Sequence, residues 1–287
     1  MCQFLARNSV PPLEEARMRN FFARFIIGLM AAVVLAPMAM GQAGAGLGNS
    51  LYNKLKDAGP GGPAPKRSVT GVWTGPLESM RGEEPVMTPL GQKLFAVHKT
   101  EAKGGWADSN DPWKTCDPFG FPRSAVNEIR GISFAEMPNK IVVMHHYNRI
   151  WREVWMDGRE LPKNVDMKGG PDSTWYGYSV GHWEGDSTLV IDTTGSDDSS
   201  WLDPRGYPHS VGGHYQERYT RVDHNHLEMT ATVDDPQIYT KPFVLGTSKF
   251  VWVPDQTSEE QICVPSEAIS YVNVISKPAA AKSAEGK

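Results

Sequence analysis

Alternating apolar and polar positions recur through the middle of the chain and predict short β-strands. In residues 227–233 the odd-numbered positions are apolar and the even-numbered ones polar, so one face packs inward and the other meets water. Residues 178–183 have a strand pattern and are followed by the turn sequence EGDS at 184–187 and an apolar run at 189–191. This order is typical of a β-hairpin that buries one face.

Similar patterns occur along most of the chain. The predicted strands are Val69–Trp73, Gly131–Met137, Lys140–Tyr147, Ile150–Met156, Tyr176–Trp183, Thr188–Thr194, His214–Val222, Leu227–Val233 and Ser248–Val253. Short connections make successive strands antiparallel neighbours, and long helical periodicity is missing. The sequence therefore predicts an all-β fold, an antiparallel up-and-down barrel of calycin or lipocalin-like type rather than a sandwich.

Two segments depart from the strand pattern. Leu90–His98 predicts a short helix in the N-terminal part of the domain, opening after Thr88 and Pro89. The segment Lys99–Pro122 is polar and broken by proline and glycine. It predicts a long lid loop without regular elements that folds over the barrel and is pinned by Cys116.

Both ends of the chain predict something other than the barrel domain. Residues 1–41 have the order of a secretory signal peptide, with basic residues, an apolar run at 25–35 and a small-residue cleavage site, and Met18 is an alternative start. The apolar run is short for a bilayer, and a retained membrane anchor is the alternative. The remaining boundaries are a flexible linker at 42–67, a single domain at 68–276 and a disordered tail at 277–287.

Cysteine content and charge fit an exported protein, periplasmic or secreted. Beyond residue 41 the only cysteines are Cys116 and Cys263, so an oxidising compartment favours a disulfide between them, with two buried free thiols as the alternative. Residues 1–41 hold four of the 29 Lys and Arg and two of the 33 Asp and Glu, which leaves the rest with a net charge of −6. Without a basic stripe, this charge argues against nucleic acid or an anionic membrane as partner, so a membrane is expected only through an uncleaved signal.

Several predicted strands carry charged residues on faces that are otherwise apolar. Arg152 shares a face with Ile150 and Val154, and Asp192 shares one with Val190. A charge on a buried face needs a partner. We therefore expect Arg152 and Asp192 to lie in or just beneath a pocket, paired with each other or with His and Tyr groups. The residues expected within reach of the same pocket are His182, His209, Glu217 and Tyr178.

Titratable residues are dense between positions 173 and 221. The candidates for proton transfer and charge stabilisation are His209, His182, Asp192, Arg152, Tyr178 and Glu217. His209 is placed first because its glycine and proline neighbours predict a loop at a strand mouth, where a side chain can meet substrate. Zinc held by His182, His209 and His214 is the alternative, but no HExxH or paired CxxC motif supports it. We expect no metal.

Aromatic residues supply the candidates for ligand contact. They are Trp151, Trp155, Tyr176, Trp183 and Trp201, together with His146 and His214. Tryptophan and tyrosine provide large, rigid apolar surfaces with a polar handle, which suit stacking on an aromatic ligand, although any single one is better explained as core. The sequence has no GxGxxG, Walker or GxSxG motif, so we expect no cofactor and no α/β-hydrolase mechanism.

Several stretches together resemble a family of secreted bacterial proteins abundant in acidobacteria and sphingomonads. They are GVW at 71–73, CDPFGFPR at 116–123, WREVWMDGR at 151–159, YSVGHWEGD at 178–186, LVIDTTG at 189–195, PHS at 208–210 and ERYTRVD at 217–223. The resemblance covers nearly the whole mature chain and implies a calycin-like fold and export rather than a reaction. This chain has Tyr178, His182 and Ser196 where that family has His, Arg and Phe, and its EGDS turn is one residue longer. These departures imply a different ligand.

Two classes of function fit these residues, and the oligomeric state stays open. One is an exported, cofactor-independent acid–base enzyme of lyase or isomerase type, acting on an apolar, hydroxylated aromatic small molecule. The other is a lipocalin-like periplasmic carrier or sensor of a hydrophobic small molecule. The number of ionisable groups favours the enzyme, because desolvating them is costly for a carrier that does not need them.

Overall fold

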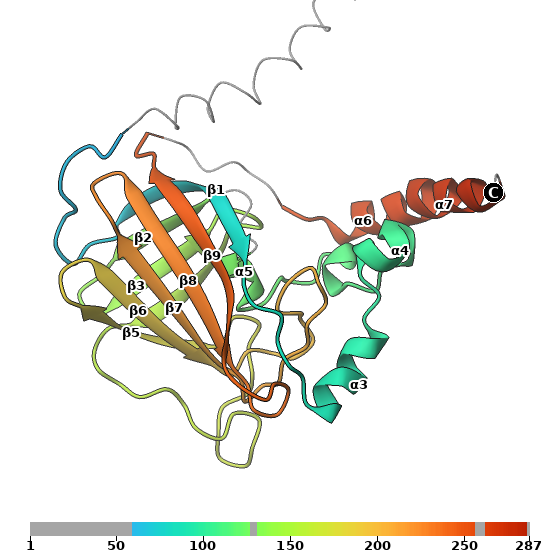
Figure 1. Ribbon diagram of the computed structural model, residues 1–287, viewed down its shortest axis with the longest axis horizontal. Coiled ribbons are helices and arrows are strands. Elements are labelled where there is room, and N and C mark those ends of the chain that lie inside the picture. The colour runs from blue at the N-terminus through green and yellow to red at the C-terminus, as the bar shows by residue number, and fades with distance from the viewer. Residues whose placement is uncertain (1–58, 127–130, 256–261, 286–287) are drawn as a thin grey trace, which may run out of the picture. The chain divides into compact units, whose positions relative to one another are not determined.

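Nine strands close into a barrel in the computed structural model of the 287-residue chain (Figure 1). The structure describes residues 59–126, 131–255 and 262–285, apart from the side chains of 75–80 and of Gly104. The strands are β1 (Gly71–Arg81), β2 (Ile132–Glu136), β3 (Lys140–His145), β4 (Ile150–Trp155), β5 (Tyr178–Glu184), β6 (Thr188–Thr194), β7 (His214–Arg221), β8 (His226–Asp234) and β9 (Phe243–Trp252). Each strand neighbours the next one in sequence, and β1 pairs with β9 to close the barrel. The predicted β-barrel is confirmed.

One pair of neighbouring strands differs from the antiparallel prediction. Strands β4 and β5 run parallel and pair only at Val154↔Ser179 and Trp155↔Val180, whereas the other neighbours are antiparallel. Parallel neighbours need a long connection that returns the chain to the starting end, and residues 156–177 supply it. The barrel is therefore mixed.

Strand alternation decides which side chains fill the interior. On β7 the odd-numbered residues are buried and the even-numbered ones are partly exposed, and β8 has the same alternation. The predicted inward face of residues 227–233 is confirmed. Phe121, which is fully buried, packs its ring edge-to-face against Tyr215 at a centroid distance of 5.7 Å. The interior is thus a packed core of side chains from the strands and from the segment before β2.

The first helix agrees with its sequence signals. Helix α3 spans Pro89–Val97, close to the predicted Leu90–His98. The hydroxyl of Thr88 accepts a hydrogen bond from Gly91 N, and Pro89 occupies the first turn, where a missing N–H costs nothing. Local capping therefore fixes where this helix begins.

The predicted lid loop contains regular elements, so that part of the prediction is wrong. Helix α4 spans Glu101–Asp108, the 3₁₀-helix η2 spans Pro112–Thr115, and the short helix α5 (Arg123–Val126) follows. The Asp111 carboxylate accepts from Trp113 N at the start of η2 and also forms a buried two-bond ion pair with Arg123. Side-chain capping and this pair satisfy backbone and charged groups that the composition alone leaves unpartnered.

The C-terminal segment is helical through Glu285. It consists of α6 (Pro265–Tyr271), the π-helix η3 (Val272–Ser276) and α7 (Lys277–Glu285). The sequence predicts a disordered tail from residue 277; the run of alanines at 279–281 explains the difference, because alanine has the highest helix propensity.

Among the described residues, no helix has the length and apolar character that a membrane crossing requires.

A disulfide joins Cys116, at the end of η2, to Cys263, just before α6. Their Cα atoms are 5.5 Å apart. The predicted pairing is therefore confirmed, and it ties the segment before β2 to the C-terminal helices.

Residues 59–287 form one compact unit, while the predicted signal peptide and residues 42–58 of the predicted linker lie outside the described residues. The described end of that linker contacts the barrel. Arg67 N donates to Asp186 O, and Lys66 Nζ lies 2.9 Å from the Asp186 carboxylate. These contacts place residues 66 and 67 against the turn between β5 and β6.

Candidate functional site

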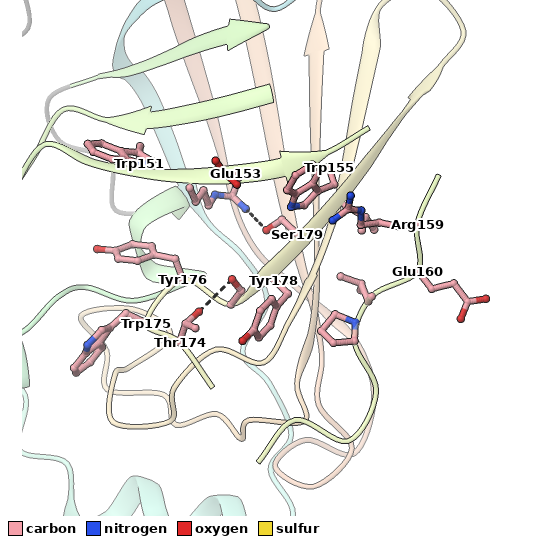
Figure 2. Close-up of a pocket in the computed structure, with 15 residues that line it drawn as sticks. Trp151, Glu153, Trp155, Arg159, Glu160, Thr174, Trp175, Tyr176, Tyr178 and Ser179 are labelled. Carbon is pink, nitrogen blue, oxygen red and sulfur yellow. Dashed lines mark hydrogen bonds between the residues drawn. The ribbon is translucent and has the colours of Figure 1, made fainter. Parts of the chain in front are cut away.

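A groove with a volume of about 670 Å³ lies at the seam where β4 and β5 diverge. Its lining residues are Trp151–Glu153, Trp155, Arg159–Pro162 and Thr174–Val180. We call this space the seam groove. Figure 2 shows Trp151 and Trp155 on β4, with Trp175 and Tyr176 below them on the segment that leads into β5, and Tyr178 at the first position of β5. Its volume falls in the range of small-molecule sites, about 300–1,000 Å³.

The groove exists because the two strands pair over so short a length. Beyond Val154 and Trp155, β4 has no partner on its β5 side among the described residues. The chain enters β5 through Gly177, which has φ 62° and lies so close to β6 that an added Cβ would come within 2.6 Å of Thr194 O. Only glycine fits such a position without strain. This turn holds residues 174–176 away from β4.

Aromatic side chains form the walls of the seam groove. Trp151 is 68 % exposed, a large value for so apolar a side chain. Two cations contact the Trp155 ring, with Arg159 Cζ 3.6 Å and Lys140 Nζ 4.9 Å from its centroid. The Tyr178 hydroxyl donates to Asp172 O at 2.7 Å, which orients its ring. These walls offer flat apolar faces in contact with solvent.

Charged groups lie at the rim. The guanidinium of Arg159 contacts both carboxylate oxygens of Asp157, with Nη2 2.6 Å from Oδ2. This hydrogen bonding lowers the pKa of Asp157 and raises the pKa of Arg159. Glu160 pairs with Lys163 at 2.9 Å in the same way. The rim charges are therefore partnered locally and ionised at neutral pH.

Arg152 lies at the floor of the groove and is almost fully buried. Its Nη1 donates to Ser179 Oγ at 3.1 Å and lies 3.4 Å from Thr193 Oγ1, while its Nη2 donates to Glu217. The other oxygen of Glu217 accepts from the Tyr219 hydroxyl at 2.8 Å. The structure thus brings together two of the predicted residues, Arg152 and Glu217, in a buried ion pair behind the aromatic walls.

Asp192 is not part of this cluster, although the sequence predicts that it lies at the pocket. It does pair with a histidine, as expected. Leu189 and Ile191 take the interior positions of β6, so Asp192 lies on the outer face. There it lies 3.1 Å from His214 Nε2 and accepts from Gln216 Nε2 at 3.0 Å. Hydrogen bonding between Asp192 and His214 lowers the pKa of the carboxyl group and raises the pKa of the imidazole.

His182 also lies on the outer face of the barrel. It is well exposed, and its Nε2 is 3.8 Å from the Glu184 carboxylate. Glu184 in turn forms a two-bond pair with Arg218. His182 and His214 therefore belong to a solvated charged surface over β5, β6 and β7, outside the residues that line the seam groove.

His209, the leading acid–base candidate, is only 2 % exposed rather than at an open strand mouth. Its Nε2 lies 3.0 Å from Ser200 Oγ and its Nδ1 lies 2.9 Å from the Tyr215 hydroxyl. Burial lowers the pKa of His209 to about 4, so the ring is neutral at neutral pH. The prediction of an accessible loop position is wrong here, because hydroxyl groups on both sides satisfy the ring inside the core.

Three other candidates for ligand contact also lie away from the groove. Trp201 is buried and stacks on His98 at a centroid distance of 4.6 Å. Trp183 packs against the core. His146 is buried, with Nε2 2.6 Å from Ser133 Oγ. Of the aromatic candidates, Trp151, Trp155, Tyr176 and Tyr178 line the seam groove together.

The sequence reasoning missed several residues of the groove. They include Ser179, Glu153, Arg159 and Leu161. A signal for them was present: the predicted strands ending at Met156 and starting at Tyr176 are separated by a long connection without strand pattern. Such a connection between neighbouring strands indicates a change of strand direction.

The zinc alternative has no counterpart in the part of the chain that the structure describes. His209 lies in the interior, whereas His182 and His214 lie on the outer face. No group of three or more His, Cys, Asp or Glu residues there is arranged to hold a metal ion.

Comparisons with protein-family models, with curated proteins and with solved structures found no match to this chain. The function therefore has to be argued from the site alone.

Proposed function

We propose that this protein binds a small apolar molecule with an aromatic ring in the seam groove, as a carrier or sensor. The observation that carries this proposal is the grouping of Trp151, Trp155, Tyr176 and Tyr178 around one space of about 670 Å³. Aromatic rings favour offset stacking or edge contacts with a flat ligand, in addition to the gain from burying apolar surface. The partnered charges at the rim keep the groove hydrated and orient a polar substituent.

The arrangement of the titratable residues favours binding over acid–base catalysis. A general acid or base has to lie within hydrogen-bond reach of the reacting atom. His209, His182 and Asp192 do not line the groove, and Glu217 is held by Arg152 and Tyr219. Of the six predicted catalytic residues, only Arg152 and Tyr178 line the space where a ligand would sit.

A pair of matched probes tests the proposal. The probes are 2-naphthol and 2-decalol, which have the same ring skeleton and hydroxyl group but differ in the aromatic face. Isothermal titration of the full chain should give at least about tenfold tighter binding of 2-naphthol, since an aromatic pair adds roughly 0.5–1.5 kcal/mol per contact. Equal binding of the two probes contradicts an aromatic site.

Variants locate the binding. Trp155→Ala should weaken 2-naphthol binding about 10- to 100-fold, the loss that follows truncation of a central aromatic anchor. Tyr271→Ala is the matched control, because Tyr271 is 53 % exposed on α6 and does not line the groove. Equal losses in the two variants would place the binding elsewhere.

The export of the protein and a calycin-like relationship are parts of the same proposal. The Cys116–Cys263 disulfide is consistent with an oxidising compartment. The closed barrel supports the relationship, and the parallel β4–β5 pair departs from a simple up-and-down barrel. Thiol titration of the denatured, unreduced protein from its host should find no free thiol at these two positions, and two free thiols would contradict the oxidised form.

A further inference from the structure

The β5 side of strand β4 has an unpaired edge. On its other side, β4 pairs with β3 along its whole length, from Trp155↔Lys140 to Ile150↔His145. On the β5 side the pairing stops after Val154 and Trp155. Residues 150–152 therefore have a complete ladder on one side and no strand partner, among the described residues, on the other, and at residue 153 only the backbone carbonyl is placed to meet β5.

Hydrogen bonds near the β3–β4 turn show which backbone groups face that edge. Met156 N donates to Asn139 O, so position 156 points its backbone groups at β3. In an antiparallel ladder this direction alternates from residue to residue. Positions 150, 152 and 154 therefore also point at β3, whereas Trp151 and Glu153 direct their backbone N–H groups into the seam. Among the described residues, neither of these two N–H groups has a backbone partner outside the strand ladders.

This edge is part of the wall of the seam groove, since residues 151–153 line it. An unpaired strand edge is a template for another extended chain, and proteins either protect it or use it for recognition. The long β4–β5 connection leaves the edge of β4 open, because Gly177 turns residues 174–176 toward β6 and away from β4. The groove thus combines two kinds of recognition, flat aromatic faces and a row of backbone hydrogen-bonding groups.

We propose that the ligand of the seam groove is a short peptide with an aromatic side chain, which adds to β4 as an extra strand. This inference rests on the proposed binding function and names its ligand class. A strand rises about 3.3 Å per residue, so the edge from Ile150 to the N–H of Glu153 has the length of a tripeptide. The peptide amides pair with Trp151 and Glu153, while its aromatic side chains lie against Trp151 and Tyr176.

Backbone pairing has a signature that ring stacking lacks. Along an extended peptide, successive N–H groups point alternately toward the edge and away from it. Methylating an N–H that points toward β4 removes a hydrogen bond and introduces a clash, whereas methylating the next one does neither. Both modifications change the free peptide in a similar way, so each serves as the control for the other.

The probes are acetyl-Phe-Ala-Tyr-amide and its variants methylated singly at the Phe, Ala or Tyr nitrogen, titrated into the full chain. We expect alternation. Either methylation at Ala weakens binding at least tenfold while methylation at Phe or at Tyr changes it less than twofold, or the reverse holds. Equal affinities across the series, or no peptide binding by a protein that binds 2-naphthol, overturn the strand addition and leave the aromatic site intact. Failure of both the peptides and 2-naphthol to bind overturns the proposed function itself.

A protein variant provides a second readout. Glu153→Pro removes an N–H that faces the seam while leaving the bonds to β3, which come from residues 152 and 154. Glu153→Ala is the matched control, since it loses the same side chain and its ion pair with Lys140 but keeps the N–H. Peptide affinity should fall at least tenfold in the proline variant relative to the alanine variant, with 2-naphthol affinity equal in the two. Equal peptide affinity in two folded variants contradicts pairing at this edge.

Discussion

Strand β7 carries an arginine–glutamate pair on each of its faces, and the two pairs differ most in their exposure to water. On the inner face Glu217 accepts from Arg152, and the two side chains are 1 % and 3 % exposed. On the outer face the next residue, Arg218, makes a two-bond contact with Glu184, and the two side chains are 37 % and 46 % exposed. Both pairs join a guanidinium group to a glutamate carboxylate, by one contact inside and by two outside, yet water reaches only the outer pair.

This difference should decide how much each residue matters. A surface ion pair gains little, typically about 0–1 kcal/mol, because water and salt screen it and side-chain entropy opposes it. Breaking a buried pair leaves one charge without partner or solvent, which costs about 3–5 kcal/mol. The inner pair also holds Ser179 and Tyr219, so its loss would leave several polar groups unsatisfied.

The largest effect is expected from Glu217→Gln, which leaves Arg152 buried without its counter-charge. The free energy of unfolding, measured by urea denaturation at pH 7, should fall by about 3–5 kcal/mol. Glu184→Gln is the control on the outer face and should lower it far less, because water already solvates that pair. Similar losses in both variants would remove the distinction between the two faces.

Removing both buried charges separates the cost of an unpaired charge from the cost of lost hydrogen bonds. The double variant Arg152→Met, Glu217→Leu should be more stable than Glu217→Gln alone, because no uncompensated charge remains. A double variant as unstable as the single one would mean that the hydrogen bonds to Ser179 and Tyr219, rather than the charge, dominate the cost.

The second effect concerns the inner histidine. Burial lowers the pKa of His209 to about 4, compared with about 6.5 for an unfolded chain. In this window the unfolded state binds more protons, so the stability that neutral His209 provides is complete above pH 6.5 and is lost as pH falls towards 4. The loss should reach about 3 kcal/mol, measured as the fall in unfolding free energy between pH 7.5 and pH 4.

Replacing His209 by glutamine, which is neutral and can both donate and accept, should remove this part of the pH dependence. The comparison is between the slopes of unfolding free energy against pH in the two proteins. Identical slopes between pH 6.5 and 4 would mean that His209 is protonated without unfolding, and so is not enclosed in the core.

The outer histidine should respond with the opposite sign and a smaller size. Its hydrogen bond with Asp192 raises the pKa of His214, so the stability it provides is present below about pH 6.5 and is lost as pH rises through the raised value. His214→Gln should therefore cost less than about 1 kcal/mol at pH 5.5 and less still at pH 8.5. A larger cost at pH 8.5 than at pH 5.5 would contradict the ion pair.

The smallest effect is expected from Arg218→Gln. The pair with Glu184 is solvated, so the variant should lose about 0.5 kcal/mol or less in dilute buffer. In 1 M NaCl, where the Debye length is about 3 Å, the difference from the unchanged protein should vanish. A loss that persists in high salt would indicate packing of the long side chain rather than charge.

The local pattern predicted most strands closely, but it missed most of β1, predicted at 69–73 and found at Gly71–Arg81, and the first half of β9, predicted at 248–253 and found at Phe243–Trp252. Residues 188–194 are predicted and found as β6 with the same ends, and 227–233 with the same inward face. Arg152 was expected to be buried because it alternates with Ile150 and Val154, and it is. These predictions need only neighbouring residues in the chain, because successive side chains along a strand point to opposite faces.

Partners and directions were not predictable in the same way. Arg152 was expected to pair with Asp192 or with His and Tyr groups, yet its carboxylate partner is Glu217, 65 residues along the chain. Asp192 and Glu217 both lie on strands of mixed polarity, and only the register of β6 against β7 puts one outside and the other inside. A shift of one residue in this register would pair Asp192 with Glu217 and put both on the same face of the sheet.

Propensity, alternation and capping act over a few residues, so most of the strands, the closed barrel they favour, helix α3 and the two cysteines of the disulfide were predictable from the chain. Three features were not: the parallel β4–β5 pair, the unpaired edge at Trp151 and the enclosure of His209 between Ser200 and Tyr215. Each of these depends on which distant segments meet, and on whether water is left between them. Burial and pairing across the barrel, rather than residue type, separate the core of this protein from its candidate site.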